Sequence, residues 1–214
     1  MRGLIGRKIG MTRVFDSNGR VVPVTILEAG PCQVTQVKTF EKDGYDSVQV
    51  GFSEAKEKHL TKPLKGHFNK NSVSPKRILA EFNKVPSFDY KAGQIFNVGL
   101  FKEGDYVTVS GKSKGHGFSG TVKKYSFSQQ RKTHGQGDTH RHVGSIGAAS
   151  YPSRVFPGKK MPSRYGNKKV SVKSLEIIKV DESNNQLLIK GSVPGSPNGI
   201  VMITRKNIYE NQYT

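Results

Sequence analysis

The first fifty residues consist of short apolar runs separated by turn-forming residues. The run over 4–15 leads into an Asp-Ser-Asn-Gly turn, and a β-branched run over 20–27 follows it. Asn-Gly between apolar runs is a strong signal for a β-hairpin. Two further runs, 33–40 and 47–52, flank a Lys-Asp-Gly turn, and the second of them alternates apolar with polar or small residues. Short strands joined by turns at this spacing predict a small β-barrel.

Helix formers interrupt the strand pattern between residues 53 and 76. Within this segment, Thr-Lys-Pro at 61–63 combines a capping residue with an early proline, which is typical of a helix start. Strand patterns return at 106–111, in a hairpin over 170–190 around an Asp-Glu-Ser-Asn-Asn turn, and at 200–203. We therefore predict a mainly β fold with a short helical insertion.

Apolar periodicity disappears between residues 112 and 169. Glycine and basic residues recur throughout this stretch, Asp138 is its only acidic residue, and its apolar residues are too sparse to bury one another. Such a segment cannot offset its own ordering entropy by forming a core. We therefore expect a polyanionic partner outside the chain to order it.

The resulting domain prediction has three parts. A barrel body covers 1–111 and 168–206 and carries the helical insertion at about 53–76. The basic segment forms an extended arm over 112–167, and a polar C-terminal tail covers 207–214. Irregular segments as long as this arm are uncommon inside compact domains and are usually functional or disordered. We therefore expect the arm to carry the function.

The composition favours a nucleic-acid-binding protein. The chain has 214 residues, a net charge of +19 and a hydrophobic fraction of 34%, and such a basic balance is the electrostatic footprint of a nucleic-acid binder. No apolar run approaches the ~18 residues of a membrane-spanning helix, and the first residues lack the apolar core of a secretory signal. The single cysteine, Cys32, excludes an intrachain disulfide framework and is expected to be a buried strand residue in a reducing compartment. We expect a cytoplasmic protein with no membrane partner.

Gly115, Gly117 and Gly120 spell the GxGxxG fingerprint of dinucleotide-binding folds, after a predicted strand. That fingerprint requires a helix at the third glycine, because the helix N-terminus holds the pyrophosphate. Residues 121–127 instead have the composition of a strand. We prefer the interpretation that these glycines let the backbone approach RNA phosphates closely. An RNA-modifying enzyme that uses this segment for a nucleotide cofactor is the rival hypothesis.

Three histidines, His134, His140 and His142, lie close together in the sequence, with His116 upstream. A zinc site usually needs four converging ligands, often including cysteine, and the sequence near these histidines holds neither a cysteine nor a second carboxylate. We expect the imidazoles to stack on bases or to hydrogen-bond to phosphates, with no metal. Asp138 has no second carboxylate nearby for acid–base catalysis, and the P-loop and HExxH motifs are missing as well. We predict a protein that is not an enzyme and takes no cofactor or small-molecule substrate.

Aromatic residues interleave with the cations of the arm. Their rings can stack on unpaired bases while the cations contact phosphates, and we expect about half of these rings to pack within the protein instead. The aromatic residues are Phe118, Tyr125, Phe127, Tyr151, Phe156 and Tyr165. The residues expected to bind RNA are Lys112, Lys114, His116, Lys123, Lys124, Arg131, Lys132, His134, His140, Arg141, His142, Arg154, Lys159, Lys160, Arg164, Lys168 and Lys169.

Three segments carry a resemblance to a known family. They are LIGRKIGMTRVF at 4–15, KGHGFSGTVKKYSF at 114–127, and THGQGDTHRHVGSIGAASYPSRVFPGKKMPSRYGNKKVSVKSLEIIKVD at 133–181. Over essentially its whole length the chain resembles bacterial ribosomal protein L3 of the large subunit. The resemblance implies a translation-protein-type six-stranded β-barrel with a long extended basic loop. It also implies a structural, ribosome-bound role, direct binding to large-subunit rRNA early in subunit assembly, and neighbouring large-subunit ribosomal proteins as partners.

The resemblance further implies a role for the tip of the loop. In the family this tip lies nearest the peptidyl transferase centre, and changes there alter sensitivity to antibiotics that bind that centre. The matching residues here are Gly144, Ser145, Ile146, Gly147, Ala148, Ala149, Ser150, Tyr151 and Pro152. Some members carry a methylated glutamine where this chain has Ser150, so we expect no such modification. A free RNA chaperone is a third hypothesis, which cosedimentation with the large subunit would distinguish.

Overall fold

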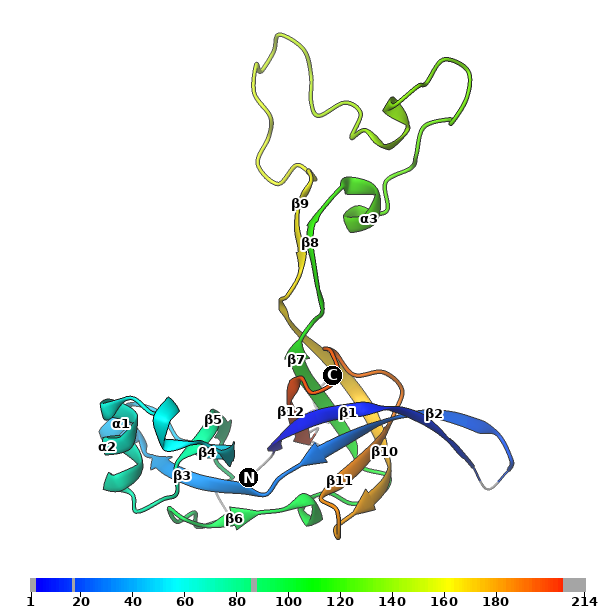
Figure 1. The fold of residues 1–214 in the computed structure, drawn as a ribbon. Coiled ribbons are helices and arrows are strands. Elements are labelled where there is room, and N and C mark those ends of the chain that lie inside the picture. Colours follow the sequence, from blue (N-terminus) through cyan, green and yellow to red (C-terminus); the bar gives the residue numbers. More distant parts are fainter. Residues whose placement is uncertain (1–2, 17, 86–87, 206–214) are drawn as a thin grey trace, which may run out of the picture. The chain divides into compact units, whose positions relative to one another are not determined.

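Six antiparallel strands close into a barrel in the computed structural model, which describes residues 3–16, 18–85 and 88–205 (Figure 1). The barrel strands are β1 (Gly3–Phe15), β2 (Val21–Ala29), β7 (Tyr106–Lys112), β10 (Lys169–Asp181), β11 (Gln186–Lys190) and β12 (Ile200–Arg205). Their order around the barrel is β1, β12, β7, β10, β11 and β2. The predicted six-stranded barrel is therefore confirmed. The predicted tail over 207–214 lies outside the described residues.

The β1–β2 hairpin follows from its local sequence. Gly19 adopts a left-handed φ of 72°, which glycine tolerates without a steric penalty. The Gly19 N–H donates to the Asp16 carbonyl, the Asp16 N–H donates to the Arg20 carbonyl, and both distances are 2.9 Å. This turn places Phe15 opposite Val21 and so fixes the register of the hairpin.

A second, four-stranded sheet lies beside the barrel, in the order β5, β4, β3, β6 (Figure 1). Its strands are β3 (Cys32–Lys38), β4 (Ser47–Glu54), β5 (Lys76–Asn83) and β6 (Ile95–Phe96). The prediction that the runs 33–40 and 47–52 belong to the barrel is wrong, because they form β3 and β4 of this sheet. Both edges of β2 are already paired, one with β1 and the other with the distant β11. The next strand along the chain therefore has no edge of β2 to join.

Short helices lie in the connections between the strands of this second sheet and directly after its last strand. They are α1 (Phe40–Asp43), α2 (Lys62–Lys70) and the 3₁₀ helices η1 (Glu57–His59) and η2 (Val98–Leu100). The helix start predicted at 61–63 is confirmed, since α2 begins directly after Thr61 and carries Pro63 in its first turn. Phe68 is the buried residue of this helix. None of the helices in the described residues has the length and apolarity needed to cross a membrane.

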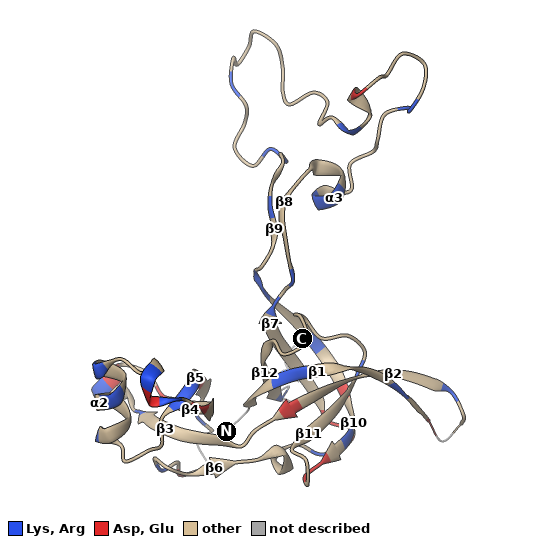
Figure 2. Cartoon of the chain, in the orientation of Figure 1, with Lys and Arg blue, Asp and Glu red and all other residues tan. Residues whose placement is uncertain are grey.

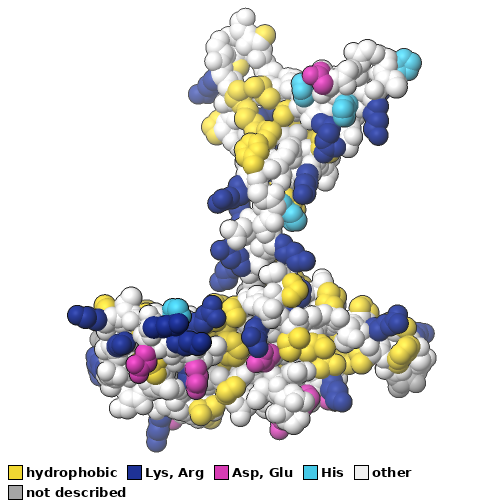
Figure 3. Space-filling view, in the orientation of Figure 1, with side chains coloured by type: hydrophobic (Ala, Val, Ile, Leu, Met, Phe, Trp, Pro, Cys, Tyr) yellow, Lys and Arg dark blue, Asp and Glu magenta, His cyan; other side chains and the backbone are white. Residues whose placement is uncertain are grey.

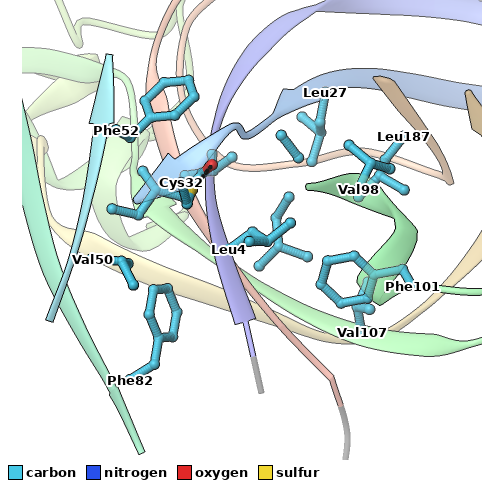
Figure 4. Packing of buried hydrophobic residues seen from close by; sticks show 14 of the residues in the cluster. Leu4, Leu27, Cys32, Val50, Phe52, Phe82, Val98, Phe101, Val107 and Leu187 are labelled. Atoms are coloured by element: carbon cyan, nitrogen blue, oxygen red, sulfur yellow. Dashed lines mark hydrogen bonds between the residues drawn. The ribbon is translucent and has the colours of Figure 1, made fainter. Parts of the chain in front are cut away.

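One hydrophobic core joins the barrel to the second sheet (Figure 4). Leu4, Leu27 and Leu187 come from barrel strands, while Val50 and Phe82 come from the second sheet, and all five are buried. The two layers approach closely at Gly3. A Cβ atom built on Gly3 would lie 2.3 Å from the Ile203 carbonyl oxygen and 2.7 Å from a Phe82 ring carbon. Glycine is therefore required where β1 meets both β12 and β5.

Cys32 lies in this core, fully buried, with its Sγ 3.4 Å from the Ile5 carbonyl oxygen (Figure 4). Burial raises the pKa of the thiol to about 11, so the thiol stays protonated at neutral pH. We expect iodoacetamide at pH 8 to alkylate Cys32 on the order of 100-fold more slowly in native protein than in urea-unfolded protein. Mass spectrometry over time checks this rate.

The same pKa shift gives a pH dependence of stability. Because the folded-state pKa lies above the unfolded one, the unfolded chain releases the thiol proton first as the pH rises. The contribution of Cys32 to the free energy of unfolding is therefore complete below about pH 9 and falls between about pH 9 and 11. A Cys32→Ala variant should lack this part of the pH profile. Rapid, stoichiometric alkylation of Cys32 by iodoacetamide in native protein at pH 8 would contradict the burial of this thiol.

The described residues divide into two compact units. The body unit extends up to Lys112 and resumes at Lys169, and the arm unit is Ser113–Lys168. The arm unit is inserted between the neighbouring barrel strands β7 and β10. Its elements are β8 (Gly115–Ser119), α3 (Thr121–Tyr125), the 3₁₀ helix η3 (Thr139–Arg141) and β9 (Ser163–Gly166).

Candidate nucleic-acid interface

The base of the arm unit is a two-stranded antiparallel ladder, β8–β9, in which Phe118 pairs with Arg164. The Ser113 N–H donates to the Lys168 carbonyl at 2.9 Å, which extends the pairing to the first and last residues of the arm unit. Gly166 makes this pairing possible, because its φ is +72° and a Cβ there would lie 2.1 Å from the Lys114 carbonyl oxygen. The glycine-rich composition of β8 hides this strand from a search for apolar alternation.

We expect Gly166→Ala to open the β8–β9 ladder, because the added Cβ both strains the left-handed backbone and clashes with the Lys114 carbonyl. The matched control is Gly158→Ala. Gly158 has a similar φ of +80°, but a Cβ added there would meet no atom within 4 Å. Both variants incur a strain of about 1 kcal/mol, and only Gly166→Ala incurs the clash.

Amide hydrogen exchange measures this difference directly. Protection across β8 and β9 should fall at least about tenfold further in Gly166→Ala than in Gly158→Ala, while barrel amides stay unchanged in both. Equal protection of the ladder in the two variants would show that the contact with Lys114 does not limit the arm's structure.

His116 and Tyr165 face each other across this ladder. Their rings are stacked, with centroids 4.9 Å apart and planes inclined by 22°. The neighbouring Phe118 is 79% exposed. The ladder therefore presents two ordered rings and one free ring beside the cations of the same strands, and stacking surfaces of this kind are what RNA-binding proteins offer to unpaired bases.

A short helix, α3, follows the ladder at Thr121–Tyr125. The prediction of a strand over 121–127 is wrong. Thr121 and Val122 favour a strand through their β-branched side chains. However, the Lys124 N–H donates to the Gly120 carbonyl, and Ser126, which ends the helix in a left-handed conformation, donates to the Val122 carbonyl.

This helix does not convert Gly115–Gly120 into a dinucleotide fingerprint. The fingerprint belongs to a βαβ unit with parallel strands, whereas β8 pairs antiparallel with β9. In addition, α3 has only five residues, which is too short to build a substantial macrodipole at its N-terminus.

Lys and Arg recur along most of the arm unit, although residues 142–153 contain none (Figure 2). Its sequence contains eleven Lys and Arg and a single acidic residue, Asp138. One carboxylate cannot neutralise eleven cations, so the unit repels itself until an external polyanion binds. In the body unit, by contrast, several cations are paired with carboxylates. These ion pairs are Arg7–Glu28, Lys38–Glu81, Lys190–Glu176 and Arg205–Asp105.

Aromatic rings hold several of the arm's cations in place. The Lys124 Nζ lies 5.0 Å from the centroid of the Tyr125 ring, and the Lys160 Nζ lies 5.7 Å from the same centroid. Lys124 also donates to the Ser163 hydroxyl and lowers the pKa of the Tyr125 hydroxyl through a hydrogen bond. Contacts of this kind restrict long flexible side chains and so reduce the entropy lost when they bind a phosphate.

Other aromatic rings of the arm unit face solvent. Tyr151 is 89% exposed and Phe156 is 57% exposed, with Arg154 packed 5.6 Å from the Phe156 ring centroid. Tyr125 and Phe127 contact each other, with centroids 6.2 Å apart. Figure 3 shows hydrophobic side chains gathered on one side of the arm unit with Lys and Arg around them. Exposed rings bordered by cations match the chemistry of stacked bases and adjoining phosphates.

The candidate residues are distributed over the strands, helices and loops of the arm unit. Lys112 ends β7 and Lys169 begins β10, so these two belong to the body unit. His140 and Arg141 lie in η3, and His142 follows directly. Among the residues that the structure describes, no three His, Cys, Asp or Glu side chains come together as a metal site requires.

The segment 144–152 is an exposed loop. The Ser145 hydroxyl donates to the Gly147 carbonyl at 3.0 Å, and the Ser153 hydroxyl donates to the Ser150 carbonyl. Tyr151 projects from this loop into solvent. The structure therefore gives the segment local turns and leaves its largest side chain free for a partner.

Comparison with known proteins identifies similar chains. The family model described as "Ribosomal protein L3" matches residues 86–186. The "Large ribosomal subunit protein uL3" of Thermotoga petrophila is 49% identical over 203 residues, which cover 95% of this chain and 96% of that protein. The protein of the same description from Thermotoga maritima has the same identity and coverage. The resemblance seen in the sequence motifs is confirmed over nearly the whole chain.

Proposed function

The chain belongs to the ribosomal protein L3 family and is a structural constituent of the large ribosomal subunit in the bacterial cytoplasm; we propose that its arm unit binds large-subunit rRNA directly, early in subunit assembly. In this proposal the barrel body holds the arm, the arm cations and histidines contact the RNA, and neighbouring ribosomal proteins adjoin the assembled chain. The similar proteins are ribosomal proteins by their descriptions, and the proposal assigns no enzymatic activity.

The charge of the arm unit is the observation that carries this proposal. Eleven cations against one carboxylate, on an arm that also exposes aromatic rings, require a polyanion with accessible bases. Double-stranded nucleic acid offers phosphates but keeps its bases stacked, while folded rRNA offers both phosphates and unpaired bases. The proposed RNA contacts are the residues named in the sequence analysis, from Lys112 to Lys169.

We further propose that residues 144–152 reach toward the peptidyl transferase centre, as the corresponding tip does in the family. The exposed Tyr151 and Ile146 supply side chains suited to packing on RNA bases. Ser150 is short and uncharged, so any RNA contact made by a modified glutamine in relatives is either made here by other groups or missing. Substitution of Tyr151 by alanine would test the contribution of this segment.

Cosedimentation tests the proposed function. The full chain, expressed with an affinity tag in a bacterial host, should sediment with the large subunit and stay bound after a moderate salt wash. Recovery only in the ribosome-free fraction would overturn the proposal. Release of the chain by a low-salt wash would favour a free RNA chaperone instead.

A further inference from the structure

The arm unit contains a cavity of about 610 Å³. It is formed where α3, the loop after it, η3 and the segment before β9 come together, and every lining residue belongs to the arm unit. Its lining includes Thr121, Gln130, Arg141, His142, Val143 and Pro162. Pockets for small organic groups typically measure about 300–1,000 Å³, so this cavity has room for a nucleotide.

Thr121 marks this cavity as a binding site. Its side chain is 1% exposed, and its Oγ1 has no hydrogen-bond partner within the described ranges of the chain. Thr139 lines the same cavity, but its hydroxyl donates to the Gln136 carbonyl at 2.6 Å. A buried hydroxyl without a partner is unfavourable in a folded protein. The Thr121 hydroxyl therefore points to a hydrogen-bonding group that enters the cavity from outside.

We propose that this cavity binds one unpaired nucleotide of the large-subunit rRNA, an inference that rests on the proposed function. The Thr121 hydroxyl can both donate and accept, and the Gln130 amide can do so as well, so together they can read the edge of a base. Val143 and Pro162 provide apolar surface for the face of the base. Arg141 provides a guanidinium for its phosphate.

The charge of the cavity favours an RNA nucleotide over a free one. Arg141 is the one Lys or Arg among the residues that line the cavity in the described part of the arm unit. One guanidinium suits the single negative charge of a phosphodiester. A free nucleotide carries a terminal phosphate with up to two negative charges, which binding sites usually surround with several cations or backbone N–H groups.

Thr121→Val removes the hydroxyl and keeps the volume of the side chain. Free protein should keep the stability of the wild type or gain slightly, because the buried hydroxyl has no partner to lose. Affinity for transcribed large-subunit rRNA should fall on the order of tenfold, as expected for one lost hydrogen bond. The salt dependence of binding should not change, because the hydroxyl contacts no phosphate.

Two further variants serve as controls for Thr121→Val. Thr121→Ser keeps a hydroxyl and should bind with nearly the affinity of the wild type. Thr133→Val is the same chemical change at an exposed arm residue outside the cavity lining and should leave both stability and affinity unchanged. Chemical probing of the bound rRNA should show that Thr121→Val loses protection at one nucleotide position while the other protected positions remain.

The outcomes separate this inference from the proposed function. Wild-type affinity and an unchanged protection pattern in Thr121→Val would overturn the nucleotide site alone. Loss of stability in free Thr121→Val, with no loss of a single protected position, would make the hydroxyl structural and overturn it as well. Saturable binding of a free ribonucleoside monophosphate to the cavity would replace the rRNA nucleotide as the occupant. Failure of the wild type to bind rRNA would overturn the proposed function, and the inference with it.

Discussion

Replacing six cations of the arm unit with glutamine should lower the affinity for large-subunit rRNA by about a thousandfold at physiological salt. The six residues are Lys123, Lys124, Arg131, Lys132, Lys159 and Lys160. Each cation that neutralises a phosphate releases counterions, and the salt slope changes by about 0.7–0.9 per contact. Six lost contacts should therefore flatten the slope of log affinity against log salt by about four to five. Filter binding between about 50 mM and 400 mM salt measures both quantities.

A charge-matched variant separates the position of the cations from the net charge of the chain. Glutamine at six exposed lysines of the body unit removes the same charge. These are Lys42, Lys56, Lys58, Lys62, Lys65 and Lys70. We expect this control to lose less than about tenfold in affinity and to keep most of its salt slope. Equal losses in the two variants would mean that binding depends on net charge and not on the arm.

Leu4→Ala should destabilise the body unit by about 2–5 kcal/mol. Leu4 is fully buried, pairs with Ile203 across β1–β12, and lies in the core shared by the barrel and the second sheet. Removing its side chain leaves a cavity between two layers that are too closely packed to collapse freely. The free energy of unfolding in urea, followed by circular dichroism, checks the size of the effect.

Leu64→Ala provides the control for this core substitution. Leu64 lies in α2 and is 40% exposed, so its truncation should cost less than about 1 kcal/mol. Leu4→Ala should also leave amide exchange in β8 and β9 unchanged, because the arm unit packs separately from the core. Similar unfolding free energies for both leucine variants would show that the shared core does not govern stability.

Local signals in the sequence were enough to predict the hairpins. The β10–β11 turn is an example, because Asp181 accepts hydrogen bonds from the backbone N–H groups of Ser183 and Asn184. Hydrogen bonds from the Ser183 hydroxyl and the Asn184 side-chain amide, together with these backbone bonds, lower the pKa of Asp181 to about 2. Asp, Ser and Asn at these positions indicate such a turn without any knowledge of the rest of the fold.

Pairings between distant segments could not be read from the sequence. Nothing near β2 indicates that β11 occupies its second edge, so the assignment of β3 and β4 to a separate sheet depends on residues more than a hundred positions away. The ladder β8–β9 joins two short segments from the beginning and the end of the arm unit's sequence. In α3, a helix forms despite the strand preference of Thr121 and Val122, and the hydrogen bond from Lys124 to the Ser163 hydroxyl ties it to the distant strand β9.

The candidate interface, like the fold, could be predicted from the sequence only in part. Charge, glycine content and aromatic residues can be counted along the sequence, and they identified the arm as the candidate RNA-binding segment. The cavity at Thr121 could not be found in this way, because its walls come from separate segments between residues 120 and 162 that only the folded arm brings together. Only the folded arm shows that a buried hydroxyl lacks a partner.

The pairing of Lys112 with Lys169 has a consequence for how such a protein can change over time. These two residues are register partners on β7 and β10, so the inserted segment leaves the barrel and returns to it at a single rung of the ladder. Within the barrel, β7 and β10 therefore pair like the two strands of a hairpin, and the whole arm takes the place of its turn. Because the entropy of closing a loop grows only slowly with its length, insertions or deletions within the arm can accumulate without disturbing the register of the barrel. Body and arm are thus free to diverge at different rates within one chain.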